Sequence, residues 1–291
     1  MHGNLCHRAG VLYVGRHRRD AWVAAYDLDG RPLRSGFRFL DEVAGRSAVR
    51  GLAMDGDHRL WVADAPAGQL RAFTLFGQQV AAVGEDGDQD PDQAGRIGTP
   101  VGVLAGGADE ELELWVASAG ARRHALHRLR PGQGSSVSLR PDGDPRGRFQ
   151  RLAGLARCGP QIYALEAGRA RVQVYRGLEH HYNLDLGPFM RGDSRPSAIA
   201  TLEDGRLVVA LEGEHGGLLL LRQDGGEERL LAGPGNDTGQ VAHPCALAVV
   251  GESELQDGGT SRIFCLDRDG ERVQVFTPEG ACYGAFPELV S

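Results

Sequence analysis

The chain has 291 residues and a formal net charge of −7 at pH 7, with an unusually large share of glycine (43 residues) and proline (14 residues). No apolar run reaches the roughly 18 residues that a membrane helix needs, and the negative charge disfavours general nucleic-acid binding. Every basic residue is arginine, which excludes Schiff-base and pyridoxal-phosphate chemistry because both need a lysine amine.

One pattern recurs along the chain: four short apolar strands separated by turns rich in Gly, Pro and Asp. The central residues of the second strand in each copy are about 50 residues apart, a spacing typical of propeller blades. These landmarks are Tyr13, Trp61, Trp115, Tyr163, Val208 and Phe264. In every copy a third-strand landmark follows 12 or 13 residues later: Tyr26, Phe73, His127, Tyr175, Leu220 and Phe276.

The repeat predicts an all-β fold, a six-bladed β-propeller with four antiparallel strands per blade, because radial repetition leaves only short sheet edges. Helical periodicity is nearly absent. The whole chain, 1–291, is predicted to be one domain with blades at about 1–40, 41–86, 97–140, 148–188, 194–232 and 241–291.

Three segments that span second and third strands are similar to those of a known family: LWVADAPAGQLRAF (60–73), IYALEAGRARVQVY (162–175) and IFCLDRDGERVQVF (263–276). With the linker GPGNDTGQVAHPCALAV (233–249), they resemble the NHL-repeat family of six-bladed β-propellers. Blade six is also similar to the peptidylglycine amidating lyases, in which a histidine beginning a first strand contributes to a channel metal. The aligned position here is Cys245, and its counterparts are Arg50, Val101, Ala153 and Ser197, a set without the required imidazoles.

In this topology, the strands that a loop connects determine the face on which its charged residues lie. Turns between first and second strands, and between third and fourth strands, carry acids such as Asp27, Asp29, Asp55 and Asp57, which predicts an acidic face. The opposite face is predicted to be rich in arginine and to bind an anionic ligand or protein partner. Its candidate binding residues are Arg16, Arg18, Arg50, Arg122, Arg123, Arg169 and Arg195. The alternative is a solvated surface whose arginines pair with neighbouring carboxylates.

Two candidate metal sites follow from the sequence. Cys6 and His7 lie on the first strand of blade one, and His243 and Cys245 begin blade six. Since these blades are neighbours in a closed propeller, the four side chains could converge on a transition metal such as zinc. Free cysteines are alternatively small buried hydrophobes. The acidic linker 85–96 resembles a calcium loop, but it lacks the later bidentate glutamate, and a solvated linker is the alternative.

The sequence is compatible with three functions. Because familiar catalytic motifs are missing, the leading one is a non-catalytic scaffold that binds a protein partner or an anionic ligand through the arginine-rich face. The second is a metal-dependent lyase or hydrolase with a site in the central channel, and the third is an RNA-binding NHL propeller. Five cysteines without CxxC spacing, and an N-terminus without a signal pattern, predict a cytoplasmic location and no membrane insertion.

Overall fold

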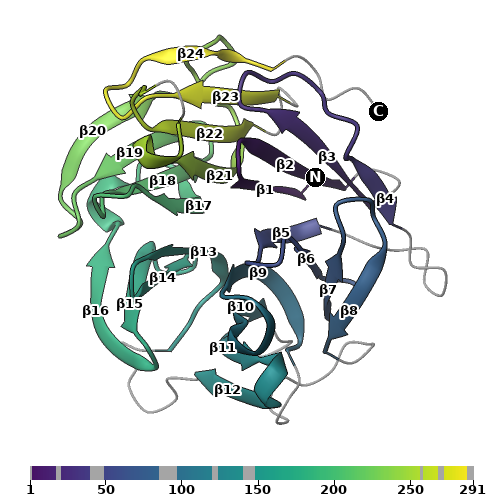
Figure 1. Ribbon diagram of the computed structural model, residues 1–291. Helices are drawn as coiled ribbons and strands as arrows, with labels where there is room; N and C mark the ends of the chain where they lie inside the picture. The colour runs from purple at the N-terminus through teal and green to yellow at the C-terminus, as the bar shows by residue number, and fades with distance from the viewer. Residues whose placement is uncertain are drawn as a thin grey trace. The chain divides into compact units, whose positions relative to one another are not determined.

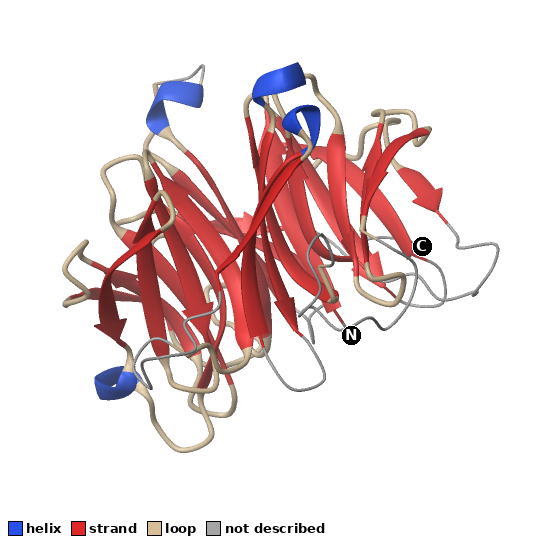
Figure 2. Cartoon of the chain, turned by 90° about the horizontal axis from the view of Figure 1, so that it is seen from below, coloured by secondary structure: helices blue, strands red, loops and turns tan. Residues whose placement is uncertain are grey.

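A computed structural model of the protein describes residues 2–17, 21–39, 49–84, 97–119, 124–139, 148–255, 258–267 and 272–286. Within these ranges the chain forms six sheets of four antiparallel strands, and the six-bladed β-propeller predicted from the repeat is confirmed (Figure 1). In every sheet the strands are neighbours in chain order. Single-turn 3-10 helices lie in connections between strands (Figure 2): Asp109–Glu111, Pro131–Gln133, Gly187–Phe189 and Glu252–Glu254. No helix in the described ranges is long and apolar enough to cross a membrane.

The chain divides into two compact units. The first comprises Met1–Asp27 and Arg31–Leu155. It holds β1 (His2–Arg8), β2 (Val11–His17), β3 (Ala21–Asp27), β4 (Phe37–Phe39), β5 (Val49–Met54), β6 (Leu60–Asp64), β7 (Gln69–Phe73), β8 (Gln79–Val83), β9 (Thr99–Gly106), β10 (Glu113–Ala119), β11 (His124–Arg130) and β12 (Ser135–Leu139).

The second unit comprises Leu28–Gly30 and Ala156–Ser291, and β13 (Leu152–Cys158) crosses the boundary between the units. The strands that follow are β14 (Gln161–Glu166), β15 (Arg171–Arg176), β16 (Glu179–Asp185), β17 (Arg195–Thr201), β18 (Leu207–Glu212), β19 (Gly217–Leu221), β20 (Glu227–Ala232), β21 (Pro244–Val250), β22 (Arg262–Asp267), β23 (Arg272–Phe276) and β24 (Cys282–Ala285).

Burial differs strongly between the strands of one sheet. All five residues of β6 are buried, whereas every residue of β8 is at least partly exposed. A strand covered on both faces must be apolar throughout, which explains the continuous apolar runs in the sequence. In the first unit, for example, Trp61 of β6 packs in one cluster with Val103 of β9 and Leu114 of β10. The six second-strand landmarks are all at most 3% exposed, so their regular spacing reflects one repeated core position.

In the turn between β5 and β6, one residue predicted for the acidic face lies in the core instead. Asp55, assigned to the acidic face from its turn position, is fully buried. Its Oδ1 accepts hydrogen bonds from the backbone N–H groups of Asp57 and Arg59, both at 2.9 Å. Its Oδ2 accepts from Arg59 Nε at 2.7 Å and from the indole Nε1 of the buried Trp61 at 2.8 Å. The carboxylate therefore organises the turn from within the core.

The partly buried carboxylate of Glu113 on β10 is expected to make the stability of the fold depend on pH. Burial alone would raise the pKa of Glu113, but hydrogen bonds from Trp115, Arg128 and Arg130 outweigh it and hold that pKa below its usual value. A lowered folded-state pKa stabilises the fold above the unfolded-state pKa, and this stabilisation is lost as the pH falls through the folded value. We expect Glu113→Gln to lower the free energy of unfolding by about 1–2 kcal/mol at pH 7.

The corresponding measurement is urea denaturation of wild type and Glu113→Gln at pH 7 and at about pH 3, chosen to lie below the usual glutamate pKa. The difference between the two proteins should shrink on acidification. A difference that stays constant with pH would contradict the assigned role of the Glu113 charge.

Candidate functional site

The strand pairings described for the chain place a β-bulge in the first strand of four sheets. The register shifts across residue 50 in β5, residue 101 in β9, residue 197 in β17 and residue 245 in β21. A bulge breaks the alternation of side chains and re-aims the extra residue, and bulges are common beside functional sites. The bulged residues are Arg50, Val101, Ser197 and Cys245, four of the five positions that the lyase resemblance aligned.

Arg50 differs from the other described candidate arginines. Its side chain is partly buried, and its Nε atom is buried without a hydrogen-bond partner in the part of the chain that the structure describes. Burial lowers the pKa of its guanidinium. Asn4 of β1 donates from Nδ2 to the Arg50 carbonyl oxygen at 3.1 Å, and its own Oδ1 accepts from the Leu5 N–H at 2.9 Å. Asn4 thus fixes the backbone at the bulge, and the guanidinium is left able to pair with an anion.

The other predicted binding residues fall into two groups. Arg195 forms an ion pair with Glu212 at 2.5 Å, and Arg169, in the turn between β14 and β15, also has a partner in the structure. For Arg195, the structure therefore shows the alternative, an arginine paired with a neighbouring carboxylate. Four predicted residues have side chains outside the described part of the chain: Arg16, Arg18, Arg122 and Arg123. The acidic linker 85–96 also lies outside it.

In the second unit, the bulged residues of β17 and β21 are linked. The Ser197 hydroxyl lies 2.6 Å from the Pro244 carbonyl oxygen and 3.2 Å from that of Ala210, and it can donate to either. Pro244 directly precedes Cys245, which is partly exposed. The neighbouring Cys265 is fully buried, and burial raises its thiol pKa well above the usual value. Cys245 is therefore the more accessible thiol of the two.

The predicted metal ligands lie on elements of both units. Cys6 packs partly buried against the core cluster that contains Tyr13 and Val49, and burial raises the pKa of its thiol. Because Cys6 and His7 are consecutive on a strand, their side chains leave opposite faces of the sheet. Among the described residues, no group of three or more His, Cys, Asp or Glu side chains could hold a metal ion. The site built from Cys6, His7, His243 and Cys245 stays a prediction.

Sequence reasoning missed a set of buried carboxylates at the ends of second strands. Asp64, Glu166 and Asp267 are fully buried, and each pairs with an arginine on the following strand. The pairs are Asp64–Arg71 at 3.4 Å, Glu166–Arg171 at 2.6 Å and Asp267–Arg272 at 3.3 Å. Blade three has Ser118 at this register, and the Ser118 hydroxyl lies 2.7 Å from Nε2 of the buried His127. The signal was an acid near the end of one apolar strand and an arginine five or seven residues later.

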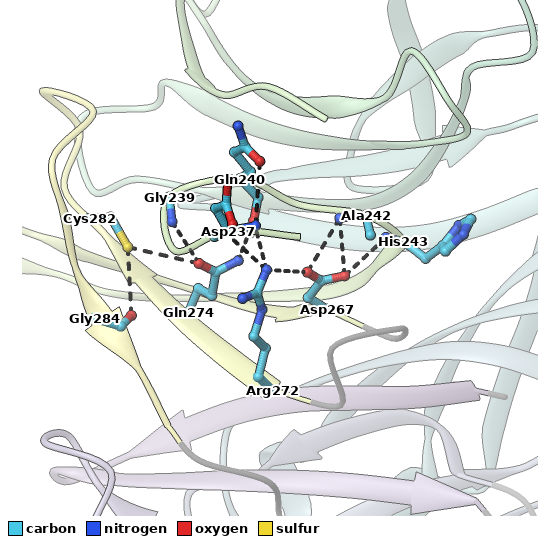
Figure 3. Close-up of polar contacts among 10 residues, drawn as sticks. All are labelled: Asp237, Gly239, Gln240, Ala242, His243, Asp267, Arg272, Gln274, Cys282 and Gly284. Carbon is cyan, nitrogen blue, oxygen red and sulfur yellow. Dashed lines mark hydrogen bonds and ion pairs between the residues drawn. The ribbon is translucent and has the colours of Figure 1, made fainter. Parts of the chain in front are cut away.

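In blade six this carboxylate fixes the linker before β21 (Figure 3). Asp267 accepts from the backbone N–H groups of Ala242 at 3.3 Å and His243 at 2.9 Å. Arg272 donates to the carbonyl oxygens of Asp237 at 3.2 Å and Gln240 at 3.1 Å. Gln274 accepts from the Gly239 N–H at 2.9 Å. The network holds the backbone that enters β21 just before the Cys245 bulge, while the His243 imidazole points away from it (Figure 3).

Comparison with known proteins identifies the fold. No protein-family model matches the sequence, and no curated protein matches it. Virginiamycin B lyase from Staphylococcus aureus superposes with a TM-score of 0.63 at 12% identity, covering 99% of this chain and 85% of that one. The WD40 propeller domain of Doa1 has a TM-score of 0.61 at 11% identity, covering 99% and 82%. A gluconolactonase from Xanthomonas campestris has 0.56 at 15%, covering 88% and 82%. Propellers host many activities, so this likeness establishes the fold alone.

Proposed function

We propose that the chain is a single NHL-type propeller that acts in the cytoplasm as a non-catalytic binding module. It takes an anionic group of a small ligand or protein partner on an arginine-rich surface that includes Arg50. The observation that carries the proposal is the partly buried Arg50 side chain, whose Nε has no partner among the described residues. All five cysteines are free thiols, in keeping with a reducing compartment.

The electrostatics of Arg50 support this function. Burial of the Arg50 guanidinium, whose Nε has no hydrogen-bond partner among the described residues, disfavours its charged form and lowers its pKa. A carboxylate or phosphate would restore its hydrogen bonds in a planar, bidentate geometry. The bulge and the Asn4 hydrogen bond hold the Arg50 backbone in place before a ligand arrives. Binding would therefore cost little reorganisation.

We expect Arg50→Gln to weaken anion binding at least about tenfold, since it removes one charge-assisted interaction. The measurement is isothermal titration calorimetry of the full chain with citrate and with inorganic phosphate at low ionic strength. Arg176→Gln is the matched control, because Arg176 is exposed at the end of β15. Equal affinity of wild type and Arg50→Gln for both anions, or no binding by wild type, would contradict the proposal.

One observation favours a metal-dependent lyase or hydrolase as second candidate. Cys245 occupies the bulge on β21, and His243 precedes it by two residues. Elemental analysis of natively purified protein separates the candidates. About one transition metal per chain, lost in Cys245→Ala, would support the metalloenzyme, whereas metal-free protein would support the binding module.

A further inference from the structure

A groove of about 640 Å³ lies in the second unit, between β16 and the turn that joins β19 to β20. The groove is shallow and open to solvent, so a ligand bound there would stay partly exposed. The lining residues are Tyr182, Asn183, Leu184, Arg222, Gln223 and Asp224. The groove shares no residue with Arg50 or with the bulged strands, so it is a separate site.

The lining mixes polar and apolar surface and carries no net charge. Arg222 and Asp224 form an ion pair at 3.5 Å, and Asp224 also accepts from the Gly226 N–H at 2.8 Å. Because the opposite charges lie side by side, the groove does not favour an anion or a cation. Leu184 is a buried apolar residue of the lining, so a ligand here would meet apolar surface beside the polar groups.

Side chains of blade four orient the polar groups of the groove. His180 Nε2 lies 2.8 Å from Asn183 Oδ1, which leaves the two Nδ2 donors of Asn183 for another acceptor. Gln223 donates from Nε2 to Gln161 Oε1 at 3.3 Å, and the Tyr163 hydroxyl donates to the same oxygen at 2.7 Å. Burial and the proximity of Tyr182 raise the pKa of Tyr163 to about 12, so this hydroxyl keeps its proton at neutral pH.

We infer that the groove binds a carbohydrate. Sugar hydroxyls both donate and accept, and the amides of Asn183 and Gln223 with the Arg222–Asp224 pair offer both donors and acceptors. The ring of Tyr182, partly exposed at the groove, provides a flat surface for the apolar face of a pyranose. A neutral, hydroxyl-rich ligand matches the combination of zero net charge, an aromatic ring and oriented amides.

The test is an array of mono- to tetrasaccharides probed with the labelled full-length protein, followed by saturation-transfer NMR with the glycans retained. Wild type should bind at least one glycan, and Tyr182→Ala and Gln223→Ala should each weaken that binding about tenfold or more. Tyr182→Phe, which keeps the ring, should retain most of it. Tyr283→Ala is the matched control, because Tyr283 is an exposed tyrosine on β24 outside the groove.

Thermal unfolding of each variant checks that it is folded. Arg50→Gln should leave glycan binding unchanged, so failure at one site is distinguishable from failure at the other. Absence of any bound glycan, undiminished binding by folded Tyr182→Ala, or competition for the groove by peptides alone would overturn the inference.

Discussion

Asp55→Ala is expected to lower the free energy of unfolding by about 3–5 kcal/mol, because it removes the fully buried carboxylate of a partly buried ion pair. The carboxylate is fully buried and accepts four hydrogen bonds, two from backbone N–H groups and two from the side chains of Arg59 and Trp61. Trp61 is itself buried, so its indole N–H would be left in the core without an acceptor. Urea denaturation at neutral pH, with the midpoint and slope fitted together, measures the loss.

A second aspartate provides the matched control. Asp27 and Arg31 have the same four-residue spacing as Asp55 and Arg59, but the Arg31 side chain is 76% exposed and the two charges are 3.6 Å apart. An exposed pair contributes about 0–1 kcal/mol, so Asp27→Ala should cost no more than that. If Asp55→Ala costs no more than Asp27→Ala, then Asp55 does not organise the core as described.

Asp267→Ala is expected to have an effect of similar size, about 3–5 kcal/mol, with a local signature as well. It removes the acceptor for the backbone N–H groups of Ala242 and His243 and the partner of Arg272. The linker before β21 should then open more easily, so hydrogen exchange at Ala242 and His243 should accelerate more than in the other sheets. Exchange measured by NMR gives the local effect, and urea denaturation gives the global one.

Two further variants test whether the effect of Asp267→Ala comes from the Asp267 carboxylate. Asp237→Ala keeps the main-chain carbonyl that accepts from Arg272, and its own side chain is exposed, so it should change stability by less than about 1 kcal/mol. Asp267→Asn keeps acceptor capacity without the charge and should fall between the other two variants. Unchanged exchange at Ala242 and His243 in Asp267→Ala would show that other contacts hold the linker.

The propeller was predictable because its core positions repeat. A large apolar residue is required at the centre of each second strand because this position is buried in all six sheets, and the requirement produces the regular spacing from Tyr13 to Phe264. The bulged positions were also identifiable through Arg50, Ser197 and Cys245. Their alignment depended on the family resemblance, since nothing in a single strand marks a bulge.

The polar core was harder to predict from sequence. The position of its turn between a first and a second strand places Asp55 on the acidic face, whereas its buried carboxylate accepts from the indole N–H of Trp61 six residues later. The carboxylate–arginine pairs were not predicted because the strand register between the two residues differs from blade to blade. Arg71 lies opposite Val62, whereas Arg171 and Arg272 lie opposite the carboxylate residues themselves, so no single spacing marks all three pairs. The groove joins Tyr182 to Arg222, residues 40 positions apart, and only the packing of two blades brings them together.

Side-chain NMR of the full chain labelled with ¹⁵N-arginine tests most directly whether Arg50 binds an anion. The Arg50 Nε–Hε signal is assigned by its absence from Arg50→Gln. On titration with citrate or inorganic phosphate, it should shift and saturate, whereas the signals of exposed arginines such as Arg176 should move little. A titration in which the Arg50 signal stays in place would contradict the proposed binding function.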